Sequence, residues 1–435
     1  MTEALITELG KISALRVISR QSVMQYKGTD KSVPEIAREL NVAALVEGSV
    51  LRDGDRVRVA AQLVGAVPER HLWADSFERD WTNVLALQRE VARAIASQIR
   101  ITLTPEEEAR LARARPVNPE AYEAYLKGRY HLNTESEEGF QKAREYLRQA
   151  IDIDPTYAPA YASLADGYNR LAIYGYHPPK EAYPIAKAAL VKALELDDAL
   201  PEAHTLLGVV KFRFDWDWRG AERELKRALQ LDPNNWRAHL GYGAYLLARG
   251  RLEEGLVEMK RHRELDPLAT TTNLNLAWAL RYNRRYDEAI AQVRKTLELA
   301  PDSAYAYVSL GENYALKKRY TEAIAACEKA LELLPEDQFV LSQCGWVLAV
   351  AGRTREALSA LEKFRRRSAS SYVDAFRVAY LAAALYPDPG QSHHALEWLE
   401  RAYEERSANL SFLKTDPMFP DRLRDDPRFQ ALLRR

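Results

Sequence analysis

The stretch from Gln230 to Pro335 repeats one phrase four times, and this phrase decides the fold. It reads Gln230-Leu-Asp-Pro233, Glu264-Leu-Asp-Pro267, Glu298-Leu-Ala-Pro301 and Leu333-Leu-Pro335. Each proline lies 34 residues after the one before. Chance does not place four prolines at one interval with matching text before them. A fixed period of this size is typical of stacked helical hairpins, which bury their apolar stripes only against their neighbours.

The unit between Pro301 and Pro335 shows how one hairpin is expected to form. Residues 304–317 and residues 320–334 each have apolar side chains at helical spacing, which predicts two helices. Gly311 is small where the second helix must approach the first closely. Pro335 cannot extend the second helix, so it opens the turn into the next unit.

Two columns of small residues recur with the same period. They contain Gly243, Ala277, Gly311 and Gly345, and then Gly255, Ala289, Ala323 and Ala357. These columns, together with the closing proline, resemble the signature of the tetratricopeptide repeat (TPR) family. The resemblance implies a right-handed TPR α-solenoid that binds a partner protein or peptide in its concave groove.

Looser copies of the hairpin flank this regular array. We expect about eight hairpins over residues 118–407, with a long insert at 173–179 that delays the second helix of one pair. Residues 104–117 are interpreted as a linker. Residues 408–435 are interpreted as a C-terminal capping segment, in which 425–433 forms a short helix over the last apolar face.

Residues 1–103 have a different pattern, which predicts a small α/β domain in front of the mainly α solenoid. Asp53-Gly54 suits a tight hairpin turn between two strands, and Leu15–Arg20 is a short β-branched run. Alternating and helical spacings predict strands at 43–51, 57–64 and 71–77, and helices at 33–40 and 84–101.

Four stretches of this domain resemble the family related to TolB amino-terminal and FlgO domains. They are Leu15-Arg-Val-Ile-Ser-Arg20, Ile36-Ala-Arg-Glu-Leu-Asn-Val42, Val46-Glu-Gly-Ser-Val50 and His71-Leu-Trp-Ala74. The resemblance implies a bacterial signalling protein, because this domain often precedes TPRs and follows an adenylate cyclase, a winged-helix domain or a Ser/Thr kinase. The family usually begins with another strand, whereas this chain starts inside the following helix. We therefore expect either an incomplete domain or a start assigned at an internal methionine.

Composition excludes several classes of function. Lys plus Arg and Asp plus Glu both number 62, and this zero net charge gives no reason to expect a nucleic-acid partner. The two cysteines, Cys327 and Cys344, form no CxxC pair, which argues against a disulfide framework or a structural zinc. No signal peptide or apolar run of membrane-spanning length is present, so we expect a cytoplasmic protein without a membrane partner.

The sequence offers no catalytic centre, cofactor site or metal site. It has no GxxxxGK[ST] loop, no kinase motif set and no HExxH. The adjacent His393 and His394 cannot face one direction on a helix, so surface positions in a loop are favoured over a metal site. The chain is predicted not to be an enzyme.

The TPR resemblance also selects the residues of a peptide-binding groove, because the first helix of each hairpin lines the groove in that family. The selected residues are Leu274, Trp278, Arg281, Tyr282, Tyr305, Val308, Glu312, Leu316, Phe339, Ser342, Trp346 and Val350. They predict an apolar surface with few charges, which suits an amphipathic helix or an extended apolar segment. The alternative is that some of these rings pack between repeats. Trp278, Tyr305 and Trp346 are the predicted hot spots.

A basic column also has the 34-residue period, in the turn inside each hairpin. It contains Arg251, Arg285, Arg319 and Arg353. A long polar side chain that suits an exposed turn is favoured over a ladder for an acidic partner.

Two functions remain in competition. The first is a non-enzymatic protein-protein interaction scaffold that binds a protein or peptide in the concave groove, in bacterial signalling or regulation. The second is the regulatory half of an adenylate cyclase, Ser/Thr kinase or winged-helix regulator whose effector domain is absent from this chain. The sequence does not define the partner or the oligomeric state.

Overall fold

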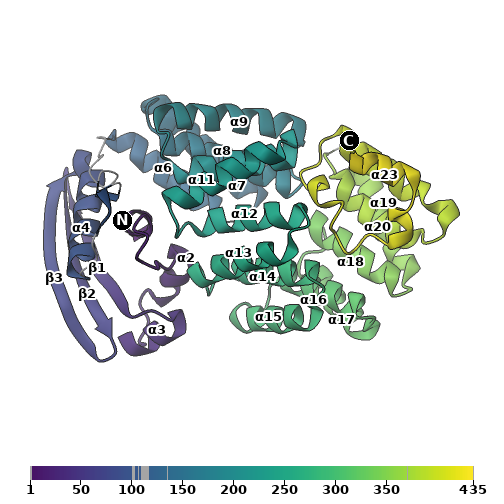
Figure 1. Cartoon of the computed structure of the whole chain (residues 1–435), viewed down its shortest axis with the longest axis horizontal. Coiled ribbons are helices and arrows are strands. Elements are labelled where there is room, and N and C mark those ends of the chain that lie inside the picture. Colours follow the sequence, from purple (N-terminus) through teal and green to yellow (C-terminus); the bar gives the residue numbers. More distant parts are fainter. Residues whose placement is uncertain are drawn as a thin grey trace.

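The computed structural model describes residues 2–99, 103–105, 107–108, 117–134, 136–369 and 371–434. These residues form a long helical array with one three-stranded antiparallel sheet near the N-terminus (Figure 1). The predicted fold class, a mainly α solenoid preceded by a small α/β unit, is confirmed. Most of the predicted linker 104–117 lies outside the described residues.

The N-terminal unit packs one helix against one face of the sheet. Its elements are α1 (Thr2–Gly10), α2 (Arg20–Val23), α3 (Val33–Leu40), β1 (Ala44–Asp53), β2 (Arg56–Ala66), β3 (Glu69–Asp80) and α4 (Val84–Gln98). The order in the sheet is β1-β2-β3, and Val59 of β2 lies opposite Val50 and Phe77. Alternate residues of β2, such as Val57 and Val59, are buried in a cluster with residues of α4. The run Leu15–Arg20 forms no strand; residues 15–19 lie between α1 and α2, and Arg20 begins α2.

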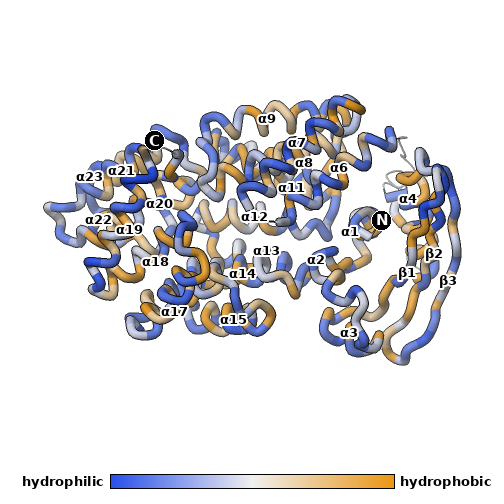
Figure 2. Tube along the Cα trace, turned by 180° about the vertical axis from the view of Figure 1, so that it is seen from behind, coloured by the Kyte–Doolittle hydropathy of each residue, from blue (hydrophilic) through white to orange (hydrophobic). Residues whose placement is uncertain are grey.

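Residues 119–404 form sixteen described α-helices that pack as eight successive pairs. They are α6 (Pro119–Leu132), α7 (Glu137–Ile153), α8 (Ala158–Ile173), α9 (Pro179–Leu196), α10 (Pro201–Val210), α11 (Trp218–Leu231), α12 (Trp236–Ala248), α13 (Leu252–Leu265), α14 (Thr270–Tyr282), α15 (Tyr286–Leu299), α16 (Ala304–Leu316), α17 (Tyr320–Leu333), α18 (Gln338–Val350), α19 (Thr354–Arg367), α20 (Ala375–Leu385) and α21 (His393–Glu404). Hydrophobic and hydrophilic residues alternate along these helices, as amphipathic packing requires (Figure 2).

The pair α16–α17 shows why the periodic residues produce a hairpin. Ser303 caps α16 by accepting a hydrogen bond from the Ala306 amide. A Cβ at Gly311 would lie 2.7 Å from the Cys327 Sγ of α17, so only glycine permits this approach of the two helices. Lys318, in the turn, has a left-handed backbone with φ 60°. The helix bounds agree with the predicted ranges to within one residue.

The N-terminal unit is anchored on the repeated Leu-Asp-Pro turns. The Asn234 side-chain amide donates to the Leu15 carbonyl oxygen at 2.6 Å. The Ser22 hydroxyl donates to the buried Asp266 carboxylate at 2.6 Å and accepts from the Leu268 amide at 2.9 Å. The phrase that closes two repeats therefore also forms the contact with the N-terminal unit.

Beyond α21 the chain turns back along the array. Residues 406–419, which we call the return segment, lead to α22 (Asp421–Arg424) and α23 (Pro427–Arg434). Phe429 of α23 is fully buried, and α23 packs on α21. Figure 1 shows α23 lying over the last repeats.

Candidate partner-binding cavity

The first helices of the eight pairs and the return segment line a cavity of about 440 Å³ that is open to one side. Wall residues come from α6, α8, α10, α12, α14, α16, α18 and α20, such as Arg129, Asn169, Trp278 and Phe339. The return segment adds Asn409, Phe412, Asp416 and Met418. A volume of this size lies in the range of small ligand sites, about 300–1,000 Å³.

The structure divides the predicted groove residues into two sets. On the cavity wall lie Leu274, Trp278, Arg281, Tyr282, Tyr305, Glu312 and Phe339. Val308 is fully buried in the core between helices, and Trp346 is only 5% exposed. Neither lines the cavity: Val308 packs within the stack, and Trp346 contacts the return segment. Ser342 is fully buried, and Leu316 and Val350 pack against the core, so these three do not line the cavity either.

Arg281 is not free for a ligand, because it forms a buried ion pair with Glu312 from the next repeat. Burial by itself lowers the pKa of Arg281, but the Glu312 and Asp416 carboxylates outweigh this effect and raise the pKa above its usual value. Arg281 therefore stays charged within the wall. Burial raises the pKa of its partner Glu312, and the Arg281 charge opposes that shift.

The return segment covers the aromatic part of the predicted groove. The Phe412 ring lies 5.2 Å from the Trp278 ring and 6.1 Å from the Tyr282 ring. Asp416 accepts hydrogen bonds from the Tyr282 hydroxyl, at 2.7 Å, and from the Tyr380 hydroxyl. The Trp346 indole donates to the Met418 carbonyl oxygen at 3.3 Å. The prediction of Trp346 as an open hot spot is therefore wrong, because the chain's own segment occupies that surface.

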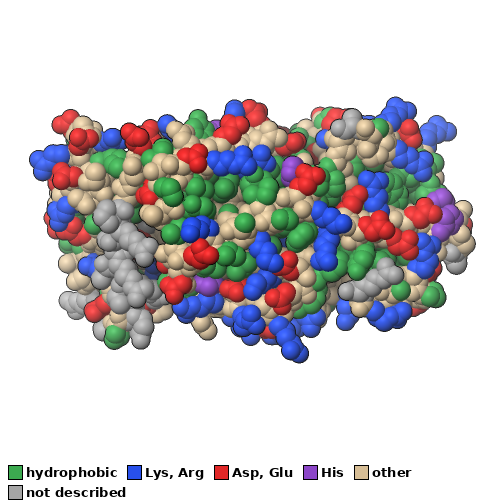
Figure 3. Space-filling view, turned by 90° about the horizontal axis from the view of Figure 1, so that it is seen from above, with side chains coloured by type: hydrophobic (Ala, Val, Ile, Leu, Met, Phe, Trp, Pro, Cys, Tyr) green, Lys and Arg blue, Asp and Glu red, His purple; other side chains and the backbone are tan. Residues whose placement is uncertain are grey.

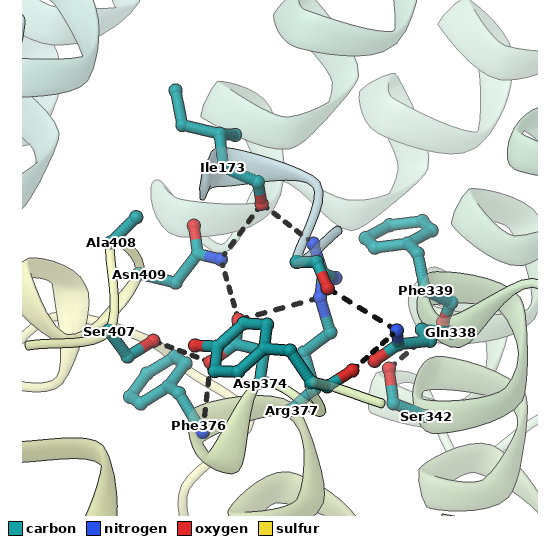
Figure 4. Close-up of polar contacts among 12 residues, drawn as sticks. Ile173, Gln338, Phe339, Ser342, Asp374, Phe376, Arg377, Ser407, Ala408 and Asn409 are labelled. Carbon is teal, nitrogen blue, oxygen red and sulfur yellow. Dashed lines mark hydrogen bonds and ion pairs between the residues drawn. The ribbon is translucent and has the colours of Figure 1, made fainter. Parts of the chain in front are cut away.

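The insert after α8 closes the cavity from another side, by joining an early pair to the last pairs (Figure 4). Arg377 of α20 donates to the Ile173 carbonyl oxygen at 3.0 Å. Gln338 of α18 donates to the Gly175 carbonyl oxygen at 3.3 Å. The Tyr176 hydroxyl donates to Asp337 at 3.4 Å. The insert thus completes the wall.

Asp374 connects this closure to the return segment. Its carboxylate accepts from the Ser407 hydroxyl at 2.6 Å and from the Asn409 amide at 3.3 Å (Figure 4). The Asn409 amide also donates to the Ile173 carbonyl oxygen at 3.4 Å. One buried carboxylate and one amide thus hold the insert, α20 and the return segment together.

The wall is more charged than the sequence predicted. It includes Arg129, Arg170, Arg213, Arg237, Arg281 and Arg377. Only Arg281 belongs to the three repeats used for the groove prediction. The others come from positions outside those three repeats: Arg129, Arg170, Arg213 and Arg237 lie between α6 and α12, and Arg377 lies on α20. Near α8, burial raises the pKa of Asp166, but Arg170 and Arg237 outweigh burial and lower it to about 2.

A polar column on the wall was missed, although its signal was present in the sequence. It contains Asn275, Ser309, Gln343 and Arg377, each 34 residues after the one before. The Gln343 side chain has a buried oxygen without a hydrogen-bond partner among the described residues. The column places one polar group per repeat along the cavity.

The basic column lies in exposed turns, and each of its arginines pairs with a glutamate three residues later. The pairs are Arg251–Glu254, Arg285–Glu288, Arg319–Glu322 and Arg353–Glu356, with N–O distances of 2.5 to 2.8 Å. This pairing favours the interpretation that a polar side chain suits the turn. On the face in Figure 3, positive and negative side chains are intermixed around hydrophobic ones.

The described residues contain no group of three or more His, Cys, Asp or Glu side chains arranged to hold a metal ion. Cys327 and Cys344 are both buried and unbridged, and burial raises the pKa of the Cys327 thiol. In the part of the chain that the structure describes, no helix has the length and apolarity to cross a membrane.

Stacked helical hairpins around a concave cavity define this chain as an α-helical repeat protein. Residues 217–270 and 274–338 match two models of the tetratricopeptide repeat. The chain therefore contains TPRs, and proteins with such repeats generally act as non-catalytic interaction scaffolds. The human IFIT1 dimer with m7Gppp-AAAA shares the fold at a TM-score of 0.52 and 12% identity, over 79% of this chain and 78% of that one.

Two curated bacterial relatives are similar to part of the chain. "Putative adenylate cyclase 3" of Rhizobium meliloti is 38% identical over 165 residues, which are 38% of this chain and 28% of the relative. The transcriptional regulator HilA of Salmonella typhimurium is 31% identical over 132 residues, which are 30% of this chain and 24% of the relative. The chain thus spans about a quarter of the length of these relatives.

Proposed function

We propose that this chain is a protein-interaction scaffold without a catalytic centre, and that its cavity binds a short segment of a partner protein. The observation that carries the proposal is the composition of the cavity wall, in which aromatic and aliphatic side chains lie beside a polar column with the period of the repeat. An extended peptide has both features, because its backbone groups need hydrogen-bond partners and its side chains need apolar surface.

The wall offers both kinds of contact. Asn275 and Gln343 supply amide groups for the backbone of a bound segment, and Leu274, Tyr305 and Phe339 supply apolar surface for its side chains. The volume of about 440 Å³ limits the enclosed stretch to a few residues. We therefore expect a short apolar anchor, with the rest of the partner outside the cavity.

We further propose that the scaffold serves as a regulatory module in the cytoplasm of a bacterium. Two observations support this proposal: the partial similarity to an adenylate cyclase and a transcriptional regulator, and the resemblance of residues 1–103 to the TolB/FlgO-related domain. In this role the TPR array senses a partner, and an effector domain responds.

The experiment is site-specific photo-crosslinking in cells that express the chain. A photoreactive phenylalanine replaces Tyr305 on the cavity wall or, as a matched control, the exposed Tyr320 of α17. We expect a defined partner only from position 305. Synthetic peptides from that partner are then titrated against Leu274→Ala, Trp278→Ala and Tyr305→Ala, each expected to lose about 2 kcal/mol of binding free energy. Equal crosslinking from both positions would refute the cavity as the binding site.

A further inference from the structure

Among the described residues, five of the six arginines on the cavity wall have a carboxylate partner, and one does not. The ion pairs are Arg129–Glu3, Arg170–Asp166, Arg237–Asp166, Arg281–Glu312 and Arg377–Asp374. Arg213 has no ion pair with any described carboxylate, although it is only 8% exposed. This exception bears on the kind of ligand that the cavity takes.

The fold fixes Arg213 in a π-helical turn, Lys211–Asp215, that follows α10. One terminal nitrogen donates to the Ala408 carbonyl oxygen at 3.1 Å and to the Asn409 side-chain oxygen at 3.2 Å. The guanidinium also lies over the rings of Phe212 and Phe412, at 5.3 and 5.0 Å. Its Nε has no hydrogen-bond partner among the described residues.

These contacts position the guanidinium without neutralising it. Carbonyl oxygens and ring faces carry only partial charges, and a buried full charge is costly unless a counter-ion pairs with it. A neutral donor at this position could hold the return segment without that cost. The retained charge therefore indicates an anion that the chain itself does not provide.

We propose that the cavity binds a carboxylate attached to an apolar or aromatic body, with Arg213 as its counter-ion. This proposal rests on the proposed function only in taking the cavity as the binding site. The Phe412 ring contacts both Arg213 and Trp278, so the acid site and the aromatic wall adjoin. The carboxylate belongs either to a free organic acid or to an Asp or Glu side chain of the partner segment.

Calorimetric titration of the full chain with matched probes tests the proposal and separates the two sources. The free-acid pair is 2-naphthoate and 2-naphthamide. The peptide pair is Ac-Phe-Glu-Leu-NH2 and Ac-Phe-Gln-Leu-NH2. We expect the acidic member of at least one pair to bind about tenfold more tightly or better, because hydrogen bonds to a charged group are stronger than those between neutral groups.

Arg213→Gln should abolish the preference for the acid, whereas Arg223→Gln, at an exposed position of α11, should preserve it. If Arg213→Gln does not fold, the acid–amide comparison on the unmodified chain still decides. Equal affinity for acid and amide would overturn the anion site and leave the proposed function intact. No binding of any probe would also overturn it, while the crosslinking from position 305 decides the proposed function separately.

Discussion

The regular repeats and the irregular segments of this molecule contribute different parts of the same cavity. From α12 to α19 each helix pair repeats the last with a period of 34 residues, and these pairs supply a continuous wall. The insert at 173–179 and the return segment follow no period, yet they close that wall through contacts with α18, with α20 and with Asp374 just before α20. Periodicity thus identifies the surface, and the irregular segments decide how much of it is open.

The largest expected change in stability follows from breaking the buried ion pair in the cavity wall. Glu312→Gln removes the ion-pair partner of the buried Arg281, and we expect a loss of about 3–5 kcal/mol in the free energy of unfolding. The matched control is Glu322→Gln, which removes the exposed partner of Arg319 and should cost much less, because solvent screens that pair. Urea unfolding followed by circular dichroism measures both, and equal losses would contradict the contrast between buried and exposed pairs.

The second prediction concerns stability and tests the close packing of the two helices within a regular hairpin. Gly311→Leu places a branched side chain where even a Cβ would meet Cys327 Sγ at 2.7 Å, so it should cost about 1–3 kcal/mol. Gly390→Leu is the control, because a Cβ at Gly390 meets nothing within 4 Å. A thermal melt of Gly311→Leu that matches the unmodified chain would show that the two helices separate more easily than the structure indicates.

A smaller effect is expected at the irregular closure. Gln338→Ala removes the hydrogen bonds to the Gly175 and Tyr372 carbonyl oxygens, which together should contribute about 1 kcal/mol. Amide hydrogen exchange should then accelerate at 173–177 and stay unchanged in α14–α17. Gln343→Ala is the matched control, because Gln343 lies on the same helix and forms no hydrogen bond with the described residues of the insert. Unchanged exchange in the Gln338 variant would mean that the insert is held by other contacts.

The smallest effect is expected for the basic column. Reversing the charge at Arg251, Arg285, Arg319 and Arg353 breaks ion pairs that solvent screens, so the free energy of unfolding should change little. Partner binding, once the crosslinking has identified the partner, should stay nearly unchanged at low and high salt. A large salt-dependent loss of affinity would instead assign the column to an acidic partner.

The regular part of the fold could be predicted because its cause is local. The closing proline, the small columns and the helical spacing specify each hairpin within one period, so the predicted bounds of α16 and α17 agree closely with the structure. The short β-branched run Leu15–Arg20 has residues of the kind that favour strands, but it pairs with no strand. Its backbone instead finds partners on the repeats, such as the Leu265 carbonyl oxygen that accepts from the Ser19 amide.

The closure could not be predicted, because its contacts join residues that the sequence separates widely. No local pattern indicates that Trp346 faces Met418, or that Arg377 reaches Ile173. Arg213 was missed for a related reason: its pair departs from the regular register at the π-helical turn. The polar column differs from the closure contacts and from Arg213, since its 34-residue period is visible in the amino-acid sequence alone.

The bond between Ile173 and Arg377 has a consequence for how the chain folds and unfolds. An open repeat array behaves as a one-dimensional chain, in which terminal repeats fray and the middle persists. Here a contact 204 residues apart in sequence joins an early pair to the last one. Neither end can then loosen without breaking contacts with the other, so cooperativity becomes global. We expect one sharp unfolding transition. We also expect slower folding than for an open array of this length, because segments distant in sequence must meet before the Ile173–Arg377 contact can form.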